Sequence, residues 1–496
     1  MTDRPRTEVV DATPLDVAAR VGEMLQDGYR VAMVAGHEDP DQFRIVYVLV
    51  RAGDDRRCEV VLRTPRDRPE IPSLASQDYA VGRFEREIRD LYGITPVGHP
   101  LPFRLVRHGH WPRGWHPMRQ DADPEPTFDE DVGSFPFLEV EGDGVYEIPV
   151  GPVHAGLIEP GHFRFSVVGE TILRMKARLW FVYRGIEKLF EGRHPADCIE
   201  LTERISGDTA VGHTLAFAIA VEQAASIEVA EEDRIIRALL LELERIHNHV
   251  ADLGALANDV GFGIINTHAQ RLRETMLRLN KATTGHRLLR GAVTIGGARL
   301  TALPDLDVVA TVAREVEELR AITLGNSTVR DRFTGTAVLS REAALSLGTL
   351  GYVARASGVD IDARKDHPFI DLGEPFEVVL ETGGDVASRY LVRARELAVS
   401  ASLIASLVQR LRGGAGTGAA RTPSGVGSGL GLVEGWRGTV AHRVELDDTG
   451  RLSRAKVVDP SFFNWPALPV ALTDTIVPDF PLANKSFNQS YAGNDL

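Results

Sequence analysis

Near the middle of the chain, residues 242 to 249 read Glu242-Leu243-Glu244-Arg245-Ile246-His247-Asn248-His249. This string lies within an amphipathic pattern of helical period that runs from Glu232 to Asp259. Patterns of the same kind occur at Glu170 to Glu191, Asp208 to Ser226, His268 to Leu289, Asp305 to Leu324 and Val386 to Arg412. Several of them exceed the mean helix length of roughly 11–12 residues. They predict a large, mainly helical domain with a buried bundle.

The first part of the chain has a different pattern. Asp16 to Gln26 has helical spacing, whereas Gln42 to Val50 and Arg57 to Thr64 alternate or run apolar as strands do. Asp78 to Tyr92 predicts a short charged helix that ends at Gly93. Residues 1–110 are therefore predicted to form a small α/β domain, and the whole chain is assigned to the α+β class.

Residues 111–145 are rich in Pro, Gly, Asp and Glu, a composition that favours an extended linker over a packed element. The second domain is predicted to span residues 146–496. It would open with two short strands, Tyr146 to Val150 and Arg164 to Val168, before the helical patterns begin.

Two segments near the C-terminus bear on ligand binding and packing. The glycine-rich stretch 413–431 superficially resembles a dinucleotide fingerprint, but it follows a helix where the fingerprint requires a preceding strand. We therefore interpret it as a loop, and nothing in the chain argues for direct contact with NAD(H). The tail, Val457 to Leu496, carries enough aromatic residues to dock on the body.

Composition limits the function classes. The formal net charge of -14 argues against nucleic acid as the main partner. Cys58 and Cys198 are 140 positions apart, so the sequence has no C-x-x-C pair for zinc or an iron–sulfur cluster. Residues 1–14 show no secretory signal, and no apolar run reaches membrane-spanning length. These features predict a cytoplasmic protein.

Two further segments combine polar side chains with sharp turns. They read Glu203-Arg204-Ile205-Ser206-Gly207-Asp208-Thr209-Ala210-Val211-Gly212-His213 and Asp459-Pro460-Ser461-Phe462-Phe463-Asn464-Trp465. Neither segment contains a cysteine. Hydroxyl and amide groups are hard, weakly basic donors, so they cannot replace thiolates as ligands of a soft metal ion.

Several strings, in one order along the chain, resemble known families. Arg83 to Ile94, followed by Gly98-His99-Pro100, resembles the signature of the complex I 30 kDa subunit. The later strings resemble the complex I 49 kDa subunit and the large subunits of membrane-bound nickel–iron hydrogenases. They are Gly151 to Phe165, Tyr183 to Arg193, Glu242 to His249, Trp436-Arg437-Gly438 and Asp459 to Leu468.

The order resembles the fused subunit of hydrogenase-3 and hydrogenase-4 (formate hydrogenlyase) complexes. Where those hydrogenases carry metal-binding cysteines, this chain has Ser206, Thr209, Ser461 and Asn464. The resemblance implies that these four residues line a cofactor cavity without nickel. Complex I uses the corresponding cavity for a quinone head group. No tyrosine occurs between Ser206 and His213, so the quinone site does not carry over whole.

The resemblance points to three candidate catalytic residues. His154 lies in the loop that offers a histidine to the quinone in complex I, and an imidazole can donate both a hydrogen bond and a proton. The alternative is a histidine that caps its own loop; His162 is a second candidate. Asp208 lies in a polar turn that opens a helix, and helix capping is its expected role. Arg437 would hold a negative ligand or form an interface salt bridge.

Other polar residues are interpreted as structural. His247 and His249 are two positions apart on a predicted helix and point to different faces, so they suit chelation poorly. Together with Glu242 and Glu244 they are expected to serve packing and salt bridges. Glu159 resembles a family glutamate that can bind magnesium, but the histidine that completes that site has no clear match. No metal ion is therefore expected on this chain.

These observations predict a peripheral-arm subunit of a membrane-bound, complex-I-like or hydrogenase-4-like oxidoreductase. A small iron–sulfur subunit would supply electrons, and quinone or another acceptor would take them. Antiporter-like membrane subunits would hold the chain on the inner face of the cell membrane. The alternative is a non-catalytic subunit that docks partners and keeps a vestigial cavity. The sequence leaves open whether the assembly uses NAD(H).

Overall fold

The computed structural model describes residues 7–130, 135–155, 158–374, 376–411, 416, 421, 423 and 425–496. The glycine-rich stretch 413–431 is interpreted above as a loop. Residues 413–415, 417–420, 422 and 424 lie outside the described residues, and the interpretation is wrong for residues 427–431, which begin a strand. Among the described residues, no helix combines the length and the apolar character that crossing a membrane requires.

A four-stranded sheet and two helices form the N-terminal domain. The sheet has the order β1-β4-β3-β2, with β1 (Thr7–Ala12), β4 (Arg56–Pro65), β3 (Gln42–Arg51) and β2 (Tyr29–Glu38). Strand β1 runs parallel to β4, and the other pairs are antiparallel. The helices are α1 (Val17–Gln26) and α2 (Tyr79–Tyr92). The predicted small α/β domain is confirmed.

Helix α2 begins and ends as the sequence predicts. The Asp78 carboxylate accepts a hydrogen bond from the Val81 amide at 3.0 Å, which satisfies a free N–H of the first turn. Gly93 ends the helix with a φ of 79°, a conformation that glycine adopts without strain. Two short strands, β5 (Glu70–Pro72) and β6 (Thr95–Val97), flank this helix in the sequence and pair in parallel.

The segment between the two predicted domains lacks regular structure but contacts the body. No helix or strand is formed by the described residues between 98 and 144. Trp111 and Met118 are nevertheless buried. The Trp111 ring lies 5.6 Å from the ring of Tyr183, and Lys188 donates to the Met118 carbonyl oxygen at 3.4 Å. The domain limits at 110 and 145 stay predictions.

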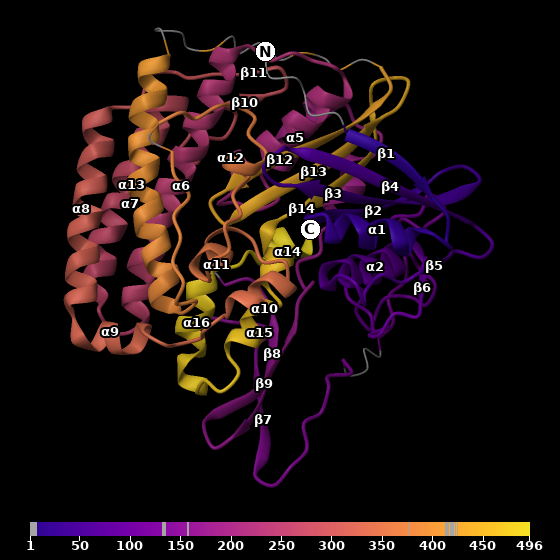
Figure 1. The fold of residues 1–496 in the computed structure, drawn as a ribbon, viewed down its shortest axis with the longest axis horizontal. Coiled ribbons are helices and arrows are strands. Elements are labelled where there is room, and N and C mark those ends of the chain that lie inside the picture. Colours follow the sequence, from indigo (N-terminus) through magenta and orange to yellow (C-terminus); the bar gives the residue numbers. More distant parts are fainter. Residues whose placement is uncertain are drawn as a thin grey trace.

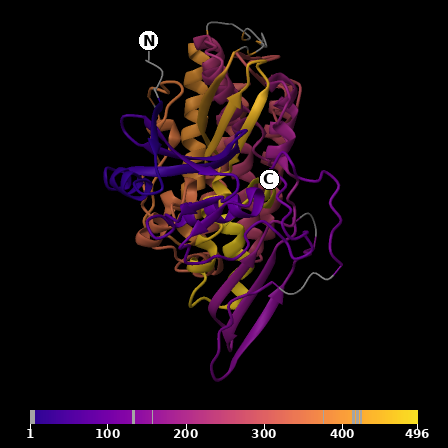
Figure 2. The ribbon, with the colours of Figure 1, turned by 90° about the vertical axis from the view of Figure 1, so that its right-hand side faces the viewer.

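Three antiparallel strands project from the body as a long hairpin sheet (Figures 1 and 2). They are β7 (Val145–Val150), β8 (His162–Val168) and β9 (Thr171–Arg178). The helix predicted from Glu170 to Glu191 is therefore wrong over most of its length, and only residues 186–190 are helical. A tight turn at Gly169 sends the chain back along β8, and Phe165 pairs with Met175 across the two strands. Cross-strand burial outweighs the local helical spacing.

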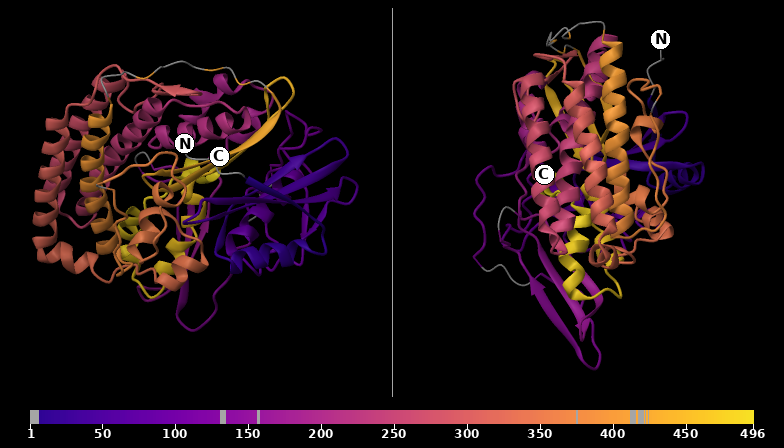
Figure 3. Two further views of the ribbon diagram at one scale, coloured as in Figure 1. Left: turned by 45° about the horizontal axis from the view of Figure 1, so that its top comes forward. Right: turned by 90° about the vertical axis from the view of Figure 1, so that its left-hand side faces the viewer.

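Four long helices form the bundle that the sequence predicts. They are α6 (Glu231–Asp259), α7 (Gly263–Thr284), α8 (Leu306–Gly325) and α13 (Val386–Arg410). Figures 1 and 3 show the bundle and the N-terminal domain on opposite sides of a central sheet. That sheet has the order β12-β13-β14, with β12 (Gly427–Gly435), β13 (Gly438–Leu446) and β14 (Leu452–Val458).

Helix α5 (Ala210–Ala224) packs directly on the central sheet because one strand face is glycine. A Cβ atom on Gly427, Gly429 or Gly431 would come within 2.2 Å of a backbone oxygen of α5. These glycines alternate along β12, so they share one face. The alternation of glycines is visible in the sequence and could have indicated a strand packed closely on a helix. The helical patterns did not predict this sheet.

Short elements complete the fold. They are α3 (Ile186–Phe190), η1 (Pro195–Cys198), α4 (Ile199–Thr202), β10 (Val293–Thr294), β11 (Gly297–Ala298), α9 (Ser327–Phe333), α10 (Arg341–Ser346), α11 (Gly351–Ala356), α12 (Ala363–Asp366), α14 (Pro460–Asn464), α15 (Ala467–Ala471), η2 (Val477–Asp479), α16 (Phe480–Phe487) and α17 (Tyr491–Asp495). The last helices confirm that the tail docks on the body.

The N-terminal domain is joined to the central sheet by buried charges. Arg443 on β13 makes two hydrogen bonds of 2.8 Å to the Glu59 carboxylate on β4. Lys456 on β14 lies 2.8 Å from Glu87 of α2 and 3.0 Å from Glu187. Because both acidic partners are buried with it, Lys456 neutralises charge that water cannot reach.

Replacing Lys456 by alanine tests this interface. The K456A variant leaves two buried carboxylates without this cation, so we expect the free energy of unfolding to fall by about 3–5 kcal/mol. Lys365, which pairs with Asp360 at a half-exposed position, provides the control. K365A should cost less than about 1 kcal/mol. Urea unfolding followed by circular dichroism measures both, and equal losses would contradict the argument.

Candidate functional site

Asp208 forms the central ion pair of the site. Its carboxylate accepts hydrogen bonds from both terminal nitrogens of Arg437, each at 2.7 Å. The hydroxyls of Ser206 and Thr209 also donate to Asp208, each at 3.0 Å. The helix-capping role expected for Asp208 is wrong, since Thr209 holds the N-cap position of α5. Arg437 offers the carboxylate two charged donors in a bidentate pair, whereas capping offers neutral backbone N–H donors.

The Arg437 guanidinium is held from three sides. It lies 3.9 Å above the Trp436 ring, and its Nε donates to the Asn488 carbonyl oxygen at 2.6 Å. Burial alone would raise the pKa of Asp208, but Arg437 and the two hydroxyls lower it to about 2. Asp208 therefore stays ionised at neutral pH, and the structure shows Arg437 in a salt bridge within this chain.

The second polar segment begins where β14 ends. Asp459 caps α14, and its Oδ1 accepts from the Ser461 amide at 2.8 Å. Asn464 has partners other than Asp208. Its side-chain amide bonds the backbone N–H and carbonyl of Leu350, at 2.8 and 3.1 Å. Four residues are predicted to bind a cofactor. Ser206, Thr209 and Ser461 are linked by hydrogen bonds through Asp208 and Ser490, and Asn464 is not part of that group.

The C-terminal segment occupies the space between the two polar segments. The Ser490 hydroxyl lies 2.8 Å from the Ser206 hydroxyl, and the Ser490 amide donates to the Ser461 hydroxyl at 2.9 Å. The indole of Trp465 donates to the Ser490 carbonyl at 3.2 Å. Ser206 and Ser461 are both buried. Sequence reasoning missed Ser490, because nothing near it in the chain marks it as a neighbour of either segment.

A buried chain of histidines lies beside this cluster. His213 Nε2 is 3.0 Å from Asp459, and its Nδ1 is 3.1 Å from Nε2 of His442 on β13. All three side chains are buried. Burial holds the pKa of His442 well below its usual value, so that ring is neutral. His442 escaped the sequence prediction because strand β13 was not predicted.

His154 lies in the loop between β7 and β8. It is half-buried, and its Nε2 is 2.8 Å from the Gly161 carbonyl oxygen. Gly161 packs so closely on Tyr491 that a Cβ would lie 2.6 Å from the tyrosine ring. The loop therefore meets the C-terminal segment, which also contacts the polar cluster around Asp208. His162 has a buried Nε2 without a hydrogen-bond partner among the described residues.

Glu159 also meets the tail. Its carboxylate accepts a hydrogen bond from the Ala492 amide at 2.9 Å. No group of three or more His, Cys, Asp or Glu in the described part of the chain is arranged to hold a metal.

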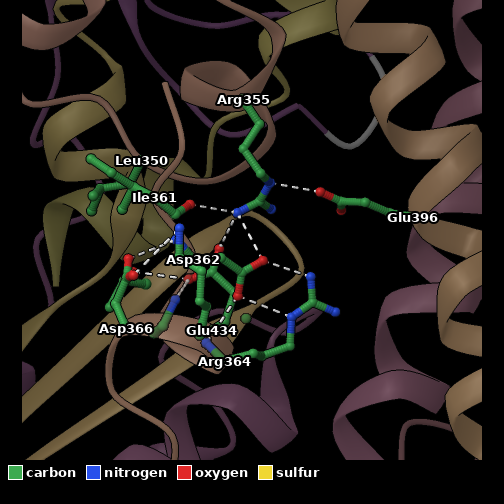
Figure 4. Close-up of polar contacts among 12 residues, drawn as sticks. Leu350, Arg355, Ile361, Asp362, Arg364, Asp366, Glu396 and Glu434 are labelled. Atoms are coloured by element: carbon green, nitrogen blue, oxygen red, sulfur yellow. Dashed lines mark hydrogen bonds and ion pairs between the residues drawn. The ribbon is translucent and has the colours of Figure 1, made fainter. Parts of the chain in front are cut away.

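The helix α6 residues lie in a network of buried charges. Glu242 pairs with Arg245 and Arg364, and His249 bonds Glu396 at 2.9 Å. Glu396 in turn pairs with Arg355, which also contacts Asp362 and Glu434 (Figure 4). His247 bonds the Leu243 carbonyl within its own helix. The two histidines do not face a common ligand.

Glu244 has a different set of partners. Its two oxygens accept the amide protons of Val211 and Gly212, at 2.7 and 3.1 Å, at the start of α5. Burial raises the pKa of Glu244 to about 8. The carboxyl group therefore carries a proton over much of the neutral range, unlike Asp208, which precedes the same helix start.

The donor set does not fit nickel. The two segments offer hydroxyls, an amide and an ionised carboxylate, and the hydroxyls of Ser206, Thr209 and Ser461 already bond protein atoms. Nickel in such a site needs thiolates. Cys58 on β4 and Cys198 in η1 lie outside both segments, and burial raises the pKa of each thiol to about 11. The fold thus defines the class as a two-domain subunit whose two polar segments offer oxygen and nitrogen donors and no thiolate.

Family comparisons agree with this class. Residues 12–127 match the family described as "Respiratory-chain NADH dehydrogenase, 30 Kd subunit", and residues 259–426 match its "49 Kd subunit". Residues 184–257 match the family "Nickel-dependent hydrogenase". The chain belongs to the family of fused 30 kDa-like and 49 kDa-like oxidoreductase subunits.

Individual relatives come from the same group of complexes. Formate hydrogenlyase subunit 5 of Escherichia coli (strain K12) is 35% identical, over 91% of this chain and 81% of that protein. Hydrogenase-4 component G of the same organism is 33% identical, over 91% of this chain and 81% of that protein. A chain of the membrane-bound sulfane sulfur reductase, an archaeal respiratory membrane complex, superposes with a TM-score of 0.66 at 25% identity. The superposition covers 71% of this chain and 99% of that one.

Replacing Glu244 by glutamine tests its protonation. Between the usual carboxyl pKa of 4.5 and the folded value of about 8, the folded state binds more protons than the unfolded state. The free energy of unfolding of the wild type therefore falls as pH rises through this window. The E244Q variant lacks this loss, so its stability relative to wild type should rise by on the order of 4 kcal/mol between about pH 5 and pH 9.

Thermal and urea unfolding across this pH range measure the difference. Glu231, exposed in the first turn of the same helix, provides the matched control. The E231Q variant should follow the wild-type pH profile. Parallel profiles for E244Q and wild type would show that Glu244 is ionised in the folded protein.

Proposed function

We propose that the chain is a peripheral-arm subunit of a membrane-bound, complex-I-like or hydrogenase-4-like oxidoreductase. It would receive electrons from a small iron–sulfur subunit and pass them to quinone or another two-electron acceptor. The supporting observations are the fused two-domain architecture and relatives that belong to redox complexes, one of them an archaeal respiratory membrane complex.

One observation carries the proposal. The positions that would need thiolates hold Ser206, Thr209 and Ser461, locked to Asp208 and the tail by hydrogen bonds. Such groups provide hydrogen bonds and a fixed charge distribution, whereas nickel chemistry needs soft ligands. The chemistry supported here is proton-coupled reduction of an organic acceptor.

The role proposed for each residue follows from its protonation state. His154 is half-buried, and its Nε2 is held by the Gly161 carbonyl oxygen, so Nδ1 is the ring atom left for a ligand. The protonated ring would donate a hydrogen bond from Nδ1 to a carbonyl oxygen of the acceptor and supply that proton. Asp208, ionised and bound by Arg437, is proposed as a positioning residue that fixes the start of α5. The catalytic role expected for Arg437 becomes the same positioning role, because its donors are already used.

The alternative function is structural, and one observation favours it. Ser490 bonds both Ser206 and Ser461, so the tail fills the place where a ligand would contact those hydroxyls. In that case the chain would hold partner subunits together and the former metal position would be vestigial.

The proposed partners follow from what this chain lacks. Only two cysteines occur in the sequence, so the iron–sulfur clusters would lie in a partner. Antiporter-like membrane subunits would hold the assembly on the inner face of the cell membrane. Neither nucleic acid nor NAD(H) is proposed as a direct ligand of this chain.

Substituting His154 in the purified whole complex separates the two functions. If His154 supplies the proton, H154Q should lower quinone-reductase turnover by about 10²–10⁴-fold while the complex keeps all its polypeptides. His268, exposed on α7, provides the control, and H268Q should retain full turnover. Unchanged turnover in H154Q would favour the structural alternative. Stoichiometric nickel bound to this chain, measured by metal analysis, would overturn both.

A further inference from the structure

A cavity of about 720 Å³ lies where α2, β9, α15 and the irregular segment after β6 meet. Its lining contains five arginines and no acidic residue: Arg83, Arg86, Arg104, Arg174 and Arg178. This concentration of positive charge contrasts with the net charge of -14 for the whole chain. Such a local excess of one sign attracts a ligand of the other sign.

Neutral groups, not carboxylates, hold these guanidinium groups in place. Arg178 donates to the carbonyl oxygens of Val106 and Arg107 at 3.1 and 2.8 Å. Arg86 donates to those of Phe103 and Arg104 at 2.8 and 3.0 Å. The ion pairs within 4.0 Å in the described part of the chain include none of the five arginines. The carbonyl groups orient the cations without neutralising them.

Burial is the largest influence on the pKa of Arg83 and of Arg178, and nearby carboxylates oppose it only in part. Burial lowers the pKa of Arg83 and of Arg178 to about 10, so both groups remain charged at neutral pH. The Nε of Arg104 is buried and has no hydrogen-bond partner among the described residues. A buried charged donor without an acceptor is costly, and an anionic ligand would remove that cost.

Aromatic rings form the remaining walls. The Phe135 ring lies 4.7 Å from the Arg178 guanidinium carbon and 5.5 Å from that of Arg104. Trp180 lies 5.7 Å from the guanidinium carbon of Arg83. Rings beside cations favour a flat apolar group next to an acidic one. The volume falls within the range of roughly 300–1,000 Å³ that is typical of small-molecule sites.

The cavity is separate from the polar cluster around Ser490. Trp465 divides them: its side chain lines the cavity, and its indole N–H donates to the Ser490 carbonyl. The arginines come from both domains, with Arg83 and Arg86 on α2 and Arg174 and Arg178 on β9. A ligand there would touch the junction between the N-terminal domain and the hairpin sheet.

We propose that this cavity is a binding site for a small organic anion that carries a phosphate or carboxylate group on a flat apolar body. The guanidinium groups would bind the acidic group in the planar, multiply bonded geometry that arginine provides. The aromatic walls would cover the apolar body.

Isothermal titration of the full chain with 2-naphthyl phosphate, and with neutral 2-naphthol, tests the site. We expect one phosphate ester to bind per chain and 2-naphthol to bind at least about tenfold more weakly, since it lacks the charge-assisted bonds. The double variant R104Q/R174Q should weaken phosphate-ester binding by about tenfold. Neither guanidinium group donates a hydrogen bond to another described residue, so the double variant should fold.

The matched control is R314Q, an exposed arginine on α8 in the helical bundle. It should bind 2-naphthyl phosphate as the wild type does. Equal affinity for the ester and for 2-naphthol, or equal binding by R104Q/R174Q and R314Q, would overturn the proposal. The same titration on the purified complex is the second arm. If the purified complex does not bind 2-naphthyl phosphate, an acidic side chain of a partner subunit occupies the cavity. That result would overturn the proposed small-ligand site.

Discussion

The bidentate ion pair between Asp208 and Arg437 is the interaction on which the centre of the molecule depends. It joins the start of α5 to the turn between β12 and β13, and Arg437 also binds the tail through the Asn488 carbonyl. Arg437 is buried and Asp208 is partly buried, so water and salt screen their attraction less than at an open surface. The ion pair thereby holds α5, the central sheet and the C-terminal tail together. Its carboxylate also orients the hydroxyls of Ser206 and Thr209, which donate to it.

The ion pair belongs to a larger set of hydrogen bonds that joins the two polar segments. The hydroxyls of Ser206, Thr209 and Ser461 each have a protein partner, so all three are satisfied. A metal site of the same shape would require deprotonated soft ligands and a space for the ion. Here Ser490 joins Ser206 to Ser461, and the ionised Asp208 accepts from Ser206 and Thr209.

Sequence periodicity predicted the long helices well, because a helix of more than two turns records its buried face every three to four residues. The same signal failed at Glu170 to Glu191. There the residues of β9 gain more from pairing with β8 than from a helix, and such pairing depends on residues outside the local window. The alternating glycines of β12 were readable as a close packing face, yet only the position of α5 gives them meaning.

The sequence by itself determined the class of protein, the order of the two domains and the absence of cysteine from both polar segments. Those properties are local: they depend on which residue stands at which position. The tertiary structure decided the partners. Asp208 binds Arg437 instead of capping its helix, Asn464 binds Leu350, and Ser490 joins two segments that are far apart in the sequence. Contacts between residues so distant in the chain arise from folding, and no local pattern encodes them.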